Sequence, residues 1–212
     1  NVRRAARGRR LKVKVGAEVD WFVYDGWEEE FAAFRKESGL DYYISGNHFL
    51  QPSEGEILDI KDLSLLAGPE REKALKNHFA AICRAIESGV FAFIAHVDYI
   101  RKSEFCPDEA FWQEKMKVVD CLEKCKTATE LSSKGLRKRG DFYPADKLIR
   151  EIVRRQIPLV VSDDAHRTGE LGFEFAKSEE YLRKLDCRRR WQFYFFAVFV
   201  RIFTVQTGFT RS

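Results

Sequence analysis

Strand-like and helix-like segments alternate along this chain, and this alternation constrains the fold more than any other feature. Short apolar runs rich in β-branched and aromatic residues indicate strands at 12–21, 40–49, 90–98, 127–133 and 157–166. Segments with helical periodicity follow them, at 26–38, 70–89, 108–125, 143–156 and 177–185. Because such alternation is typical of parallel strands joined by crossover helices, we predict an α/β fold.

Polar side chains collect where the expected strands end. The residues at these ends are, in chain order, Glu18, Asp20, His48, His96, Asp98, Glu130, Asp164 and His166. In a parallel α/β barrel the carboxyl ends of the strands share one face, which is the face where active sites are built. We therefore expect these side chains to converge on one site.

The stretch LVVSDDAH, residues 159–166, shows the pattern most clearly. Asp164 and His166 are two residues apart, so on an extended backbone they point to the same side. That side is where a metal ion or the charged group of a substrate would sit.

Histidines strengthen the metal interpretation. The chain has four, and three of them, His48, His96 and His166, lie at expected strand ends, whereas His78 lies within a helical segment and reads as structural. Imidazole and carboxylate ligands suit zinc, manganese or iron. Glu18 has two carboxylate oxygens and could bridge two ions, which would clamp the oxygens of a phosphoryl displacement.

Composition describes an ordinary globular protein, which we interpret as one domain over 1–212. The net charge is +4, and part of it comes from the Arg-rich segment at 1–12. That segment could contact nucleic acid or a membrane, but we favour an exposed arm. The five cysteines are an odd number and form no CxxC pair, so we expect a reducing compartment, no disulfide and no zinc–thiolate site.

Neither a signal peptide nor a membrane span is expected, which favours a cytoplasmic protein. The most apolar stretch is FYFFAVFVRIFTV at 193–205, which carries Arg201. We expect it to form one buried strand or two.

Five segments in order carry a resemblance to a known family. They are GAEVDW, LDYYISGNHFL, IAHVDYIRK, ATELSSKGLRKRGDFYP and IPLVVSDDAHRTGELG. Together they resemble the PHP (polymerase and histidinol phosphatase) superfamily, most closely its histidinol-phosphatase branch, over about 13–185. The resemblance implies a distorted (β/α)7 barrel of the TIM-like type with two or three metal ions at the carboxyl ends of its strands.

The resemblance also implies roles for individual residues. Glu18 resembles the bridging glutamate, and His48 and His96 resemble the remaining protein ligands of one ion. Asp164 resembles a ligand of a second ion and His166 of a third, and either would serve the leaving group as an acid. Arg101 and Arg137 resemble the arginines that contact the substrate phosphate, a task that suits the planar guanidinium. Weaker candidates, expected to orient the ligands, are Asn47, Asp98 and Asp163; Asp20 is undecided and Glu130 reads as structural.

Two parts of the chain depart from the family. The family begins with a His-x-His strand upstream of the Glu18 equivalent, whereas this chain has no histidine before His48. We therefore expect the first barrel strands and about half of the ligands to be missing, one ion to keep its full ligand set, and the chain by itself to be marginally stable. The tail at 186–212 departs too, either as a divergent strand pair or as the product of a frameshift.

The predicted function is hydrolysis of L-histidinol phosphate in histidine biosynthesis by a metal-dependent phosphomonoesterase. Its partner would be a small phosphate ester, and we expect neither a membrane nor a nucleic acid. Two alternatives stay open. One is another PHP phosphoesterase, of the protein-tyrosine phosphatase or exonuclease type, and the other is an inactive remnant that binds one metal ion.

Overall fold

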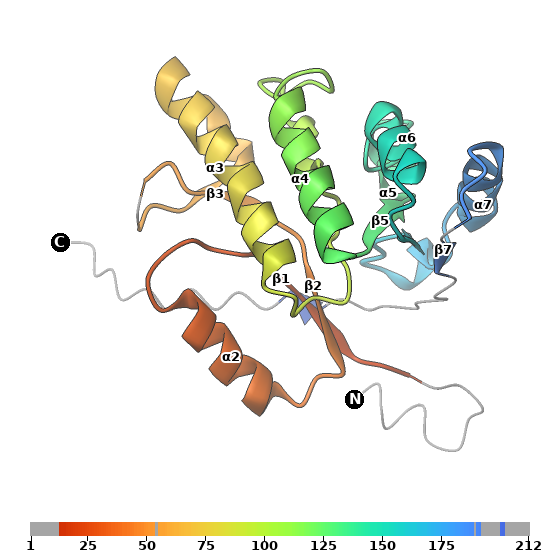
Figure 1. Ribbon diagram of the computed structural model, residues 1–212, viewed down its shortest axis with the longest axis horizontal. Helices are drawn as coiled ribbons and strands as arrows, with labels where there is room; N and C mark the ends of the chain where they lie inside the picture. The colour runs from red at the N-terminus through yellow and green to blue at the C-terminus, as the bar shows by residue number, and fades with distance from the viewer. Residues whose placement is uncertain (1–12, 54, 189, 192–199, 202–212) are drawn as a thin grey trace.

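Parallel β-strands lie side by side in the computed structural model, which describes residues 13–53, 55–188, 190–191 and 200–201 (Figure 1). Strand β1 (Gly16–Val19) pairs with β2 (Tyr42–Ser45) on one side and with β8 (Val200–Arg201) on the other. Strand β5 (Thr129–Ser132) pairs with β6 (Leu159–Ser162), which pairs with β7 (Arg190–Trp191). All these pairings are parallel, so the α/β class is confirmed.

Ile94 joins the two groups of strands into one run. It forms parallel bridges to Ser45 at the end of β2 and to Thr129 at the start of β5. The order along the run is β8, β1, β2, Ile94, β5, β6 and β7. Over the residues that the structure describes, this run is open, with β8 and β7 at its edges. The barrel therefore stays a prediction.

Helices flank the run of strands. They are α2 (Trp27–Ser38), α3 (Gly68–Glu87), α4 (Trp112–Cys125), α5 (Lys134–Lys138), α6 (Asp146–Arg154) and α7 (Phe175–Lys184). In Figure 1, α3, α4, α6 and α7 stand in a row on one side of the strands, and α2 lies on the other. Five of the six match predicted helices, and α5 was not expected. Short 3-10 helices cover Ile60–Leu65, Tyr99–Lys102 and Thr168–Glu170.

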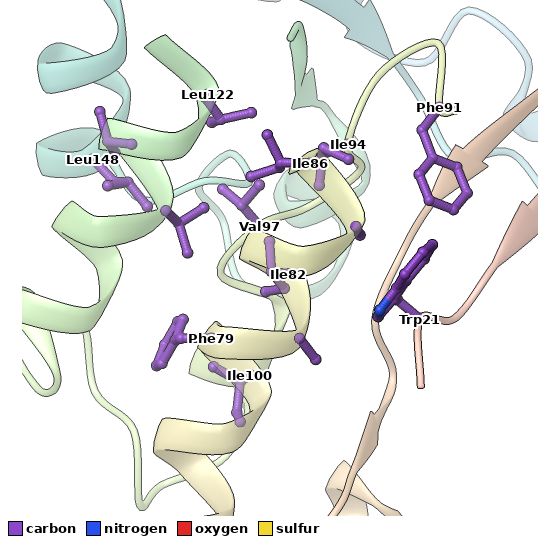
Figure 2. Close-up of a cluster of buried hydrophobic side chains, with 14 of the residues drawn as sticks. Trp21, Phe79, Ile82, Ile86, Phe91, Ile94, Val97, Ile100, Leu122 and Leu148 are labelled. Atoms are coloured by element: carbon purple, nitrogen blue, oxygen red, sulfur yellow. The ribbon is translucent and has the colours of Figure 1, made fainter. Parts of the chain in front are cut away.

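The core lies between α3 and the strand-end segments. Phe79, Ile82 and Ile86 form the buried face of α3, at the three- and four-residue spacing of an amphipathic helix. Figure 2 shows them facing Val97 and Ile100, which follow the Ile94 bridge. Each side chain of this size stabilises the fold by about 1.5–3 kcal/mol when it is fully buried. The segment at 96–101 is thus held by its apolar residues, while its polar residues are left for the site.

The predicted strand at 90–98 is wrong in extent. Its backbone does lie between β2 and β5, since the amide of Ala95 donates to the carbonyl of Ser45 (2.7 Å) and the amide of Ile94 to that of Ala128 (2.9 Å). The extended course stops at His96, whose φ is 24°. This left-handed backbone turns the chain away from the sheet immediately after the bridge.

Two other predicted strands end early. The one at 40–49 divides at Gly46 into β2 and a short strand β3 (Phe49–Leu50), which pairs antiparallel with β4 (Leu58–Asp59). The one at 157–166 ends as β6 at Ser162, because Asp164 has a left-handed φ of 45°. Asp164 and His166 therefore do not lie on an extended strand, and the argument from their two-residue spacing is wrong.

All five cysteines are free in the structure, so none forms a disulfide. The reducing compartment stays a prediction. In the part of the chain that the structure describes, no helix has the length and apolar character needed to cross a membrane. The apolar stretch at 193–205 and the tail at 186–212 fall largely outside the described residues.

Candidate metal centre

Three buried side chains meet at the carboxyl ends of neighbouring strands. Glu18 comes from β1, His48 follows β2, and His96 follows the Ile94 bridge. Their exposed fractions are 8, 7 and 3 %. Each offers one potential ligand atom, and these atoms lie within 4.8 Å of one another. The structure thus brings together the three residues that the family resemblance assigned to one ion.

Glu18 lies between the two imidazoles. Its Oε1 is 3.0 Å from Nε2 of His96 and 3.8 Å from Nε2 of His48. Burial by itself would raise the pKa of Glu18, but the hydrogen bond and charge of His96 lower it below its usual value. Burial would likewise lower the pKa of His96, and Glu18 raises it instead. The pair therefore favours positive charge beside the carboxylate, which a proton or a metal ion can supply.

Asp20 fixes the ring of His48. Its carboxylate accepts a hydrogen bond from the backbone N–H of His48, and its Oδ2 lies 3.3 Å from His48 Nδ1. A proton on Nδ1 would be donated to Asp20, which leaves the lone pair of Nε2 on the side of Glu18. Metal-binding histidines are commonly oriented by such a carboxylate. The sequence left Asp20 undecided, although its place two residues after Glu18 was the signal.

Glu130 holds the strained turn at His96. Its Oε1 accepts the backbone N–H of His96 at 2.8 Å, and its Oε2 accepts the hydroxyl of Ser162 at 2.6 Å. Glu130 belongs to β5 and Ser162 to β6, so these two strands support the turn at His96. The structural interpretation of Glu130 agrees with these contacts.

Gly46 makes room for the cluster. A Cβ atom at this position would lie 2.0 Å from Oε1 of Glu18 and 2.9 Å from Cε1 of His96, which is closer than real Cβ contacts come. Any side chain here would displace the carboxylate from the histidines. Gly46 was missed in the sequence, because no local pattern marks its contact with Glu18.

The donor set fits a divalent metal ion on three observations. Two imidazoles and one carboxylate are ligands that zinc, manganese and iron all accept. Nδ1 of His96 is buried and has no hydrogen-bond partner. The glycine at position 46 leaves the Glu18 carboxylate free to approach both rings.

Asp164 and His166 lie outside this three-residue cluster. The carboxylate of Asp164 is buried and forms an ion pair with the ammonium group of Lys134, and its Oδ1 lies 3.5 Å from Nδ1 of His166. The side chain of His166 is 55 % exposed. Asp164 is nonetheless close enough to the cluster for its charge to raise the pKa of His96. Burial lowers that pKa, and Glu18 and Glu130 raise it by more than Asp164 does.

The two predicted phosphate-binding arginines differ in their surroundings. Arg101 is 2 % exposed and donates to both oxygens of Asp108 (2.6 and 2.8 Å) and to Asp141 (2.6 Å). Arg137 donates to the backbone carbonyls of Asp163 (2.9 Å) and Asp164 (3.3 Å). Arg137 thus lies against the loop that carries the predicted ligands, and Arg101 lies in a cluster of acids.

The weaker candidates hold loops at the site. The side chain of Asn47 bonds to both the N–H and the carbonyl of Trp21, which joins the loops after β1 and β2. Asp163 accepts from the amides of Ala165 (3.1 Å) and Gly172 (2.5 Å). These contacts agree with an orienting role.

Asp98 makes a similar contact to a loop. The carboxylate of Asp98 accepts a hydrogen bond from the backbone N–H of Ala145 at 2.7 Å, and burial raises the pKa of Asp98 to about 6.

Comparison with known proteins finds similarity to histidinol phosphatases. No protein-family model matches the chain. A Deinococcus radiodurans protein provisionally named histidinol-phosphatase is 28 % identical over 187 residues, which cover 84 % of this chain and 67 % of that protein. The histidinol-phosphatase of Bacillus subtilis strain 168 is 24 % identical over 184 residues, covering 78 % of this chain and 68 % of that one.

Solved structures support the fold. A Listeria monocytogenes protein provisionally assigned as a histidinol phosphatase superimposes with a TM-score of 0.63 at 20 % identity, covering 79 % of this chain and 68 % of that chain. A chain of an archaeal ribonuclease P complex with mature tRNA gives a TM-score of 0.54 at 14 % identity, covering 87 % of this chain and 65 % of that chain. These likenesses show a shared fold.

Proposed function

We propose that this chain is a metal-dependent phosphomonoesterase that hydrolyses L-histidinol phosphate to L-histidinol and phosphate in histidine biosynthesis. The single observation that carries the proposal is the buried group of Glu18, His48 and His96 at the strand ends. The similarity to the two histidinol-phosphatases selects the substrate. A cytoplasmic location is part of the same proposal.

In this proposal Glu18, His48 and His96 hold a divalent ion, either zinc, manganese or iron. When bound, the ion would polarise a phosphoryl oxygen and lower the pKa of a water molecule. Asp20 keeps the ring of His48 in the orientation that ligation needs. Glu130 and Gly46 keep His96 and Glu18 at the distance that lets both reach one ion.

Substrate contacts would come from the neighbouring loops. Arg137 is 16 % exposed in its side chain and lies beside Asp164, so its guanidinium could turn towards a phosphate with little rearrangement. Arg101 would reach a phosphate only after releasing Asp108 or Asp141. His166, with its half-exposed ring, is the better placed of the two candidate acids to protonate the leaving alkoxide.

The finer assignment of the fold belongs to the same proposal. Membership of the PHP superfamily as a single domain with a distorted (β/α)7 barrel is supported by the all-parallel order of the main strands and by the likeness to the Listeria structure.

An inactive remnant is the second candidate, and one observation favours it. Among the described residues a single group offers three metal ligands, while Asp164 is occupied by Lys134. Such a protein would bind one ion without turnover.

Hydrolysis of a panel of substrates tests the proposal, measured as phosphate release from the two phosphomonoesters and as nucleotide release from the oligonucleotide. The purified chain with added Mn²⁺ or Zn²⁺ would be given L-histidinol phosphate, a phosphotyrosine peptide and a single-stranded oligonucleotide. We expect turnover of L-histidinol phosphate to exceed that of the other two. Preference for the peptide or the oligonucleotide would support another PHP phosphoesterase, and metal binding without any turnover would support the remnant.

A further inference from the structure

Lys134 is a charged residue beside the candidate metal centre, and the proposed function gives it no role. It is the first residue of α5, directly after β5, and its ammonium group forms an ion pair with the carboxylate of Asp164 in the loop after β6. The side chains are 19 and 7 % exposed. Because β5 and β6 are adjacent and in register at Ser132 and Ser162, the pair lies at the same sheet edge as the candidate metal centre.

Both partners act on the metal centre through their charge. The ammonium of Lys134 is among the charges that lower the pKa of Glu18, after the larger effects of burial and the two histidines. The charge of the Asp164 carboxylate raises the pKa of Glu130, although burial is the largest cause of that rise. The pair is therefore part of the same electrostatic site as Glu18.

The surroundings of Asp164 suit an ammonium better than a second metal ion. In the described part of the chain, Asp164 does not join a group of three ligands. Its Oδ2 meets Lys134, and its Oδ1 lies 3.5 Å from His166. A divalent ion at Asp164 would have to displace the lysine or lie beside a like charge.

The charge balance of the site also favours an ammonium over a second divalent ion at Asp164. One divalent ion and one ammonium together neutralise the carboxylates of Glu18, Asp20 and Asp164. Glu130 adds at most one more negative charge. A second divalent ion added to the ammonium would leave this site with an excess of positive charge.

We propose that Lys134 is the built-in second cation of this site. Its ammonium takes, at Asp164, the place of a second divalent ion, so that the site holds one exchangeable ion and one fixed charge. A lysine can donate up to three hydrogen bonds, so Lys134 would also meet a phosphoryl oxygen of the substrate. The inference rests on the proposed function, because it assigns Lys134 a place in the same phosphate-binding site.

Metal stoichiometry tests this directly, without an activity readout. Equilibrium dialysis with Mn²⁺ would be run on the native chain, on Lys134→Met, and on Lys138→Met as a control from the exposed face of the same helix. We expect about one ion per chain for the native protein and the control, and a second ion for Lys134→Met. Adding Asp164→Asn to Lys134→Met should remove that second ion.

Phosphate binding gives a second readout. The double variant Lys134→Met/Asp164→Asn, which should hold one Mn²⁺, should bind inorganic phosphate about tenfold more weakly than Asp164→Asn alone, as expected for the loss of one charged hydrogen-bond donor. Lys138→Met should bind phosphate as the native chain does.

The single variant Asp164→Asn keeps the test decisive if Lys134→Met does not fold. We expect it to leave the stoichiometry at about one ion, because Asp164 serves the lysine. Two ions in the native chain, or no second ion in a folded Lys134→Met, would overturn the inference while leaving the proposed phosphatase intact. A native chain that binds no Mn²⁺ would contradict both.

Discussion

Oδ2 of Asp20 lies 3.3 Å from Nδ1 of His48, and the same carboxylate accepts the backbone N–H of that histidine. Two residues from different strand ends are thereby fixed in one orientation, with Nε2 of His48 on the side of Glu18. The candidate metal centre thus has a supporting layer already in place, and several of its contacts can be tested individually.

Replacing Asp20 by asparagine should weaken metal binding without unfolding the chain. The amide loses the negative charge that polarises the His48 ring, so we expect the Kd for Mn²⁺ to rise about 10- to 100-fold. Isothermal titration calorimetry would measure it. Asp25→Asn, an exposed aspartate in the same loop, is the matched control. Equal affinities for the two variants would show that Asp20 does not support the ligand.

Gly46→Ala should damage the centre by steric overlap. The added methyl would lie 2.0 Å from Oε1 of Glu18, and overpacking of this kind costs about 1–3 kcal/mol. We expect a lower free energy of unfolding in urea together with loss of Mn²⁺ binding. Gly68→Ala, where an added Cβ meets nothing within 4 Å, should change neither. Native metal affinity in Gly46→Ala would contradict the close packing described here.

Arg101→Met should act mainly on stability. Arg101 is almost fully buried and satisfies Asp108 and Asp141, which are themselves 41 and 46 % exposed. Breaking a fully buried pair costs about 3–5 kcal/mol, and the exposure of the two acids reduces this to about 2 kcal/mol. Urea unfolding of Arg101→Met and of the more exposed Arg139→Met would be compared. A stable Arg101→Met protein with weakened phosphate binding would instead support the phosphate role predicted from sequence.

His78 should make stability sensitive to acid. Burial lowers its pKa from 6.5 to about 4, so the folded chain keeps it neutral while the unfolded chain takes up a proton. The contribution of neutral His78 to the free energy of unfolding is therefore present above pH 6.5 and is lost as the pH falls towards 4. We expect about 2 kcal/mol of this loss between pH 7 and pH 5.

Urea unfolding of metal-free protein at the two pH values would measure the loss. His78→Gln should lose about 2 kcal/mol less than the native chain over this interval, since the other titrating groups are common to both proteins. The same loss in both proteins would show that His78 is not its source.

Sequence reasoning found the centre of the site because one rule of parallel sheets is strong. Carboxyl ends of neighbouring strands share an edge, so the polar residues at the expected strand ends could be grouped without coordinates. The resemblance to the PHP superfamily then selected Glu18, His48 and His96 as the ligands of one ion. The helices were predictable for a similar reason, since the apolar face of α3 has a clear helical spacing.

The rest depended on backbone turns that the sequence did not reveal. Positive φ values at His96 and Asp164 end two predicted strands early, and neither residue type demands that conformation. The ion pair of Lys134 with Asp164 joins residues 30 positions apart, and no local pattern marks it. Gly46 could be recognised only once the position of Glu18 was known.

Metal-dependent phosphatase activity is tested most directly by kcat/KM for L-histidinol phosphate as a function of Mn²⁺ concentration, in the native chain and in Glu18→Gln, with the exposed Glu29→Gln as control. We predict metal-dependent turnover that falls at least about a hundredfold in Glu18→Gln and is unchanged in Glu29→Gln. Turnover that needs no metal, or that survives in Glu18→Gln, would contradict this prediction.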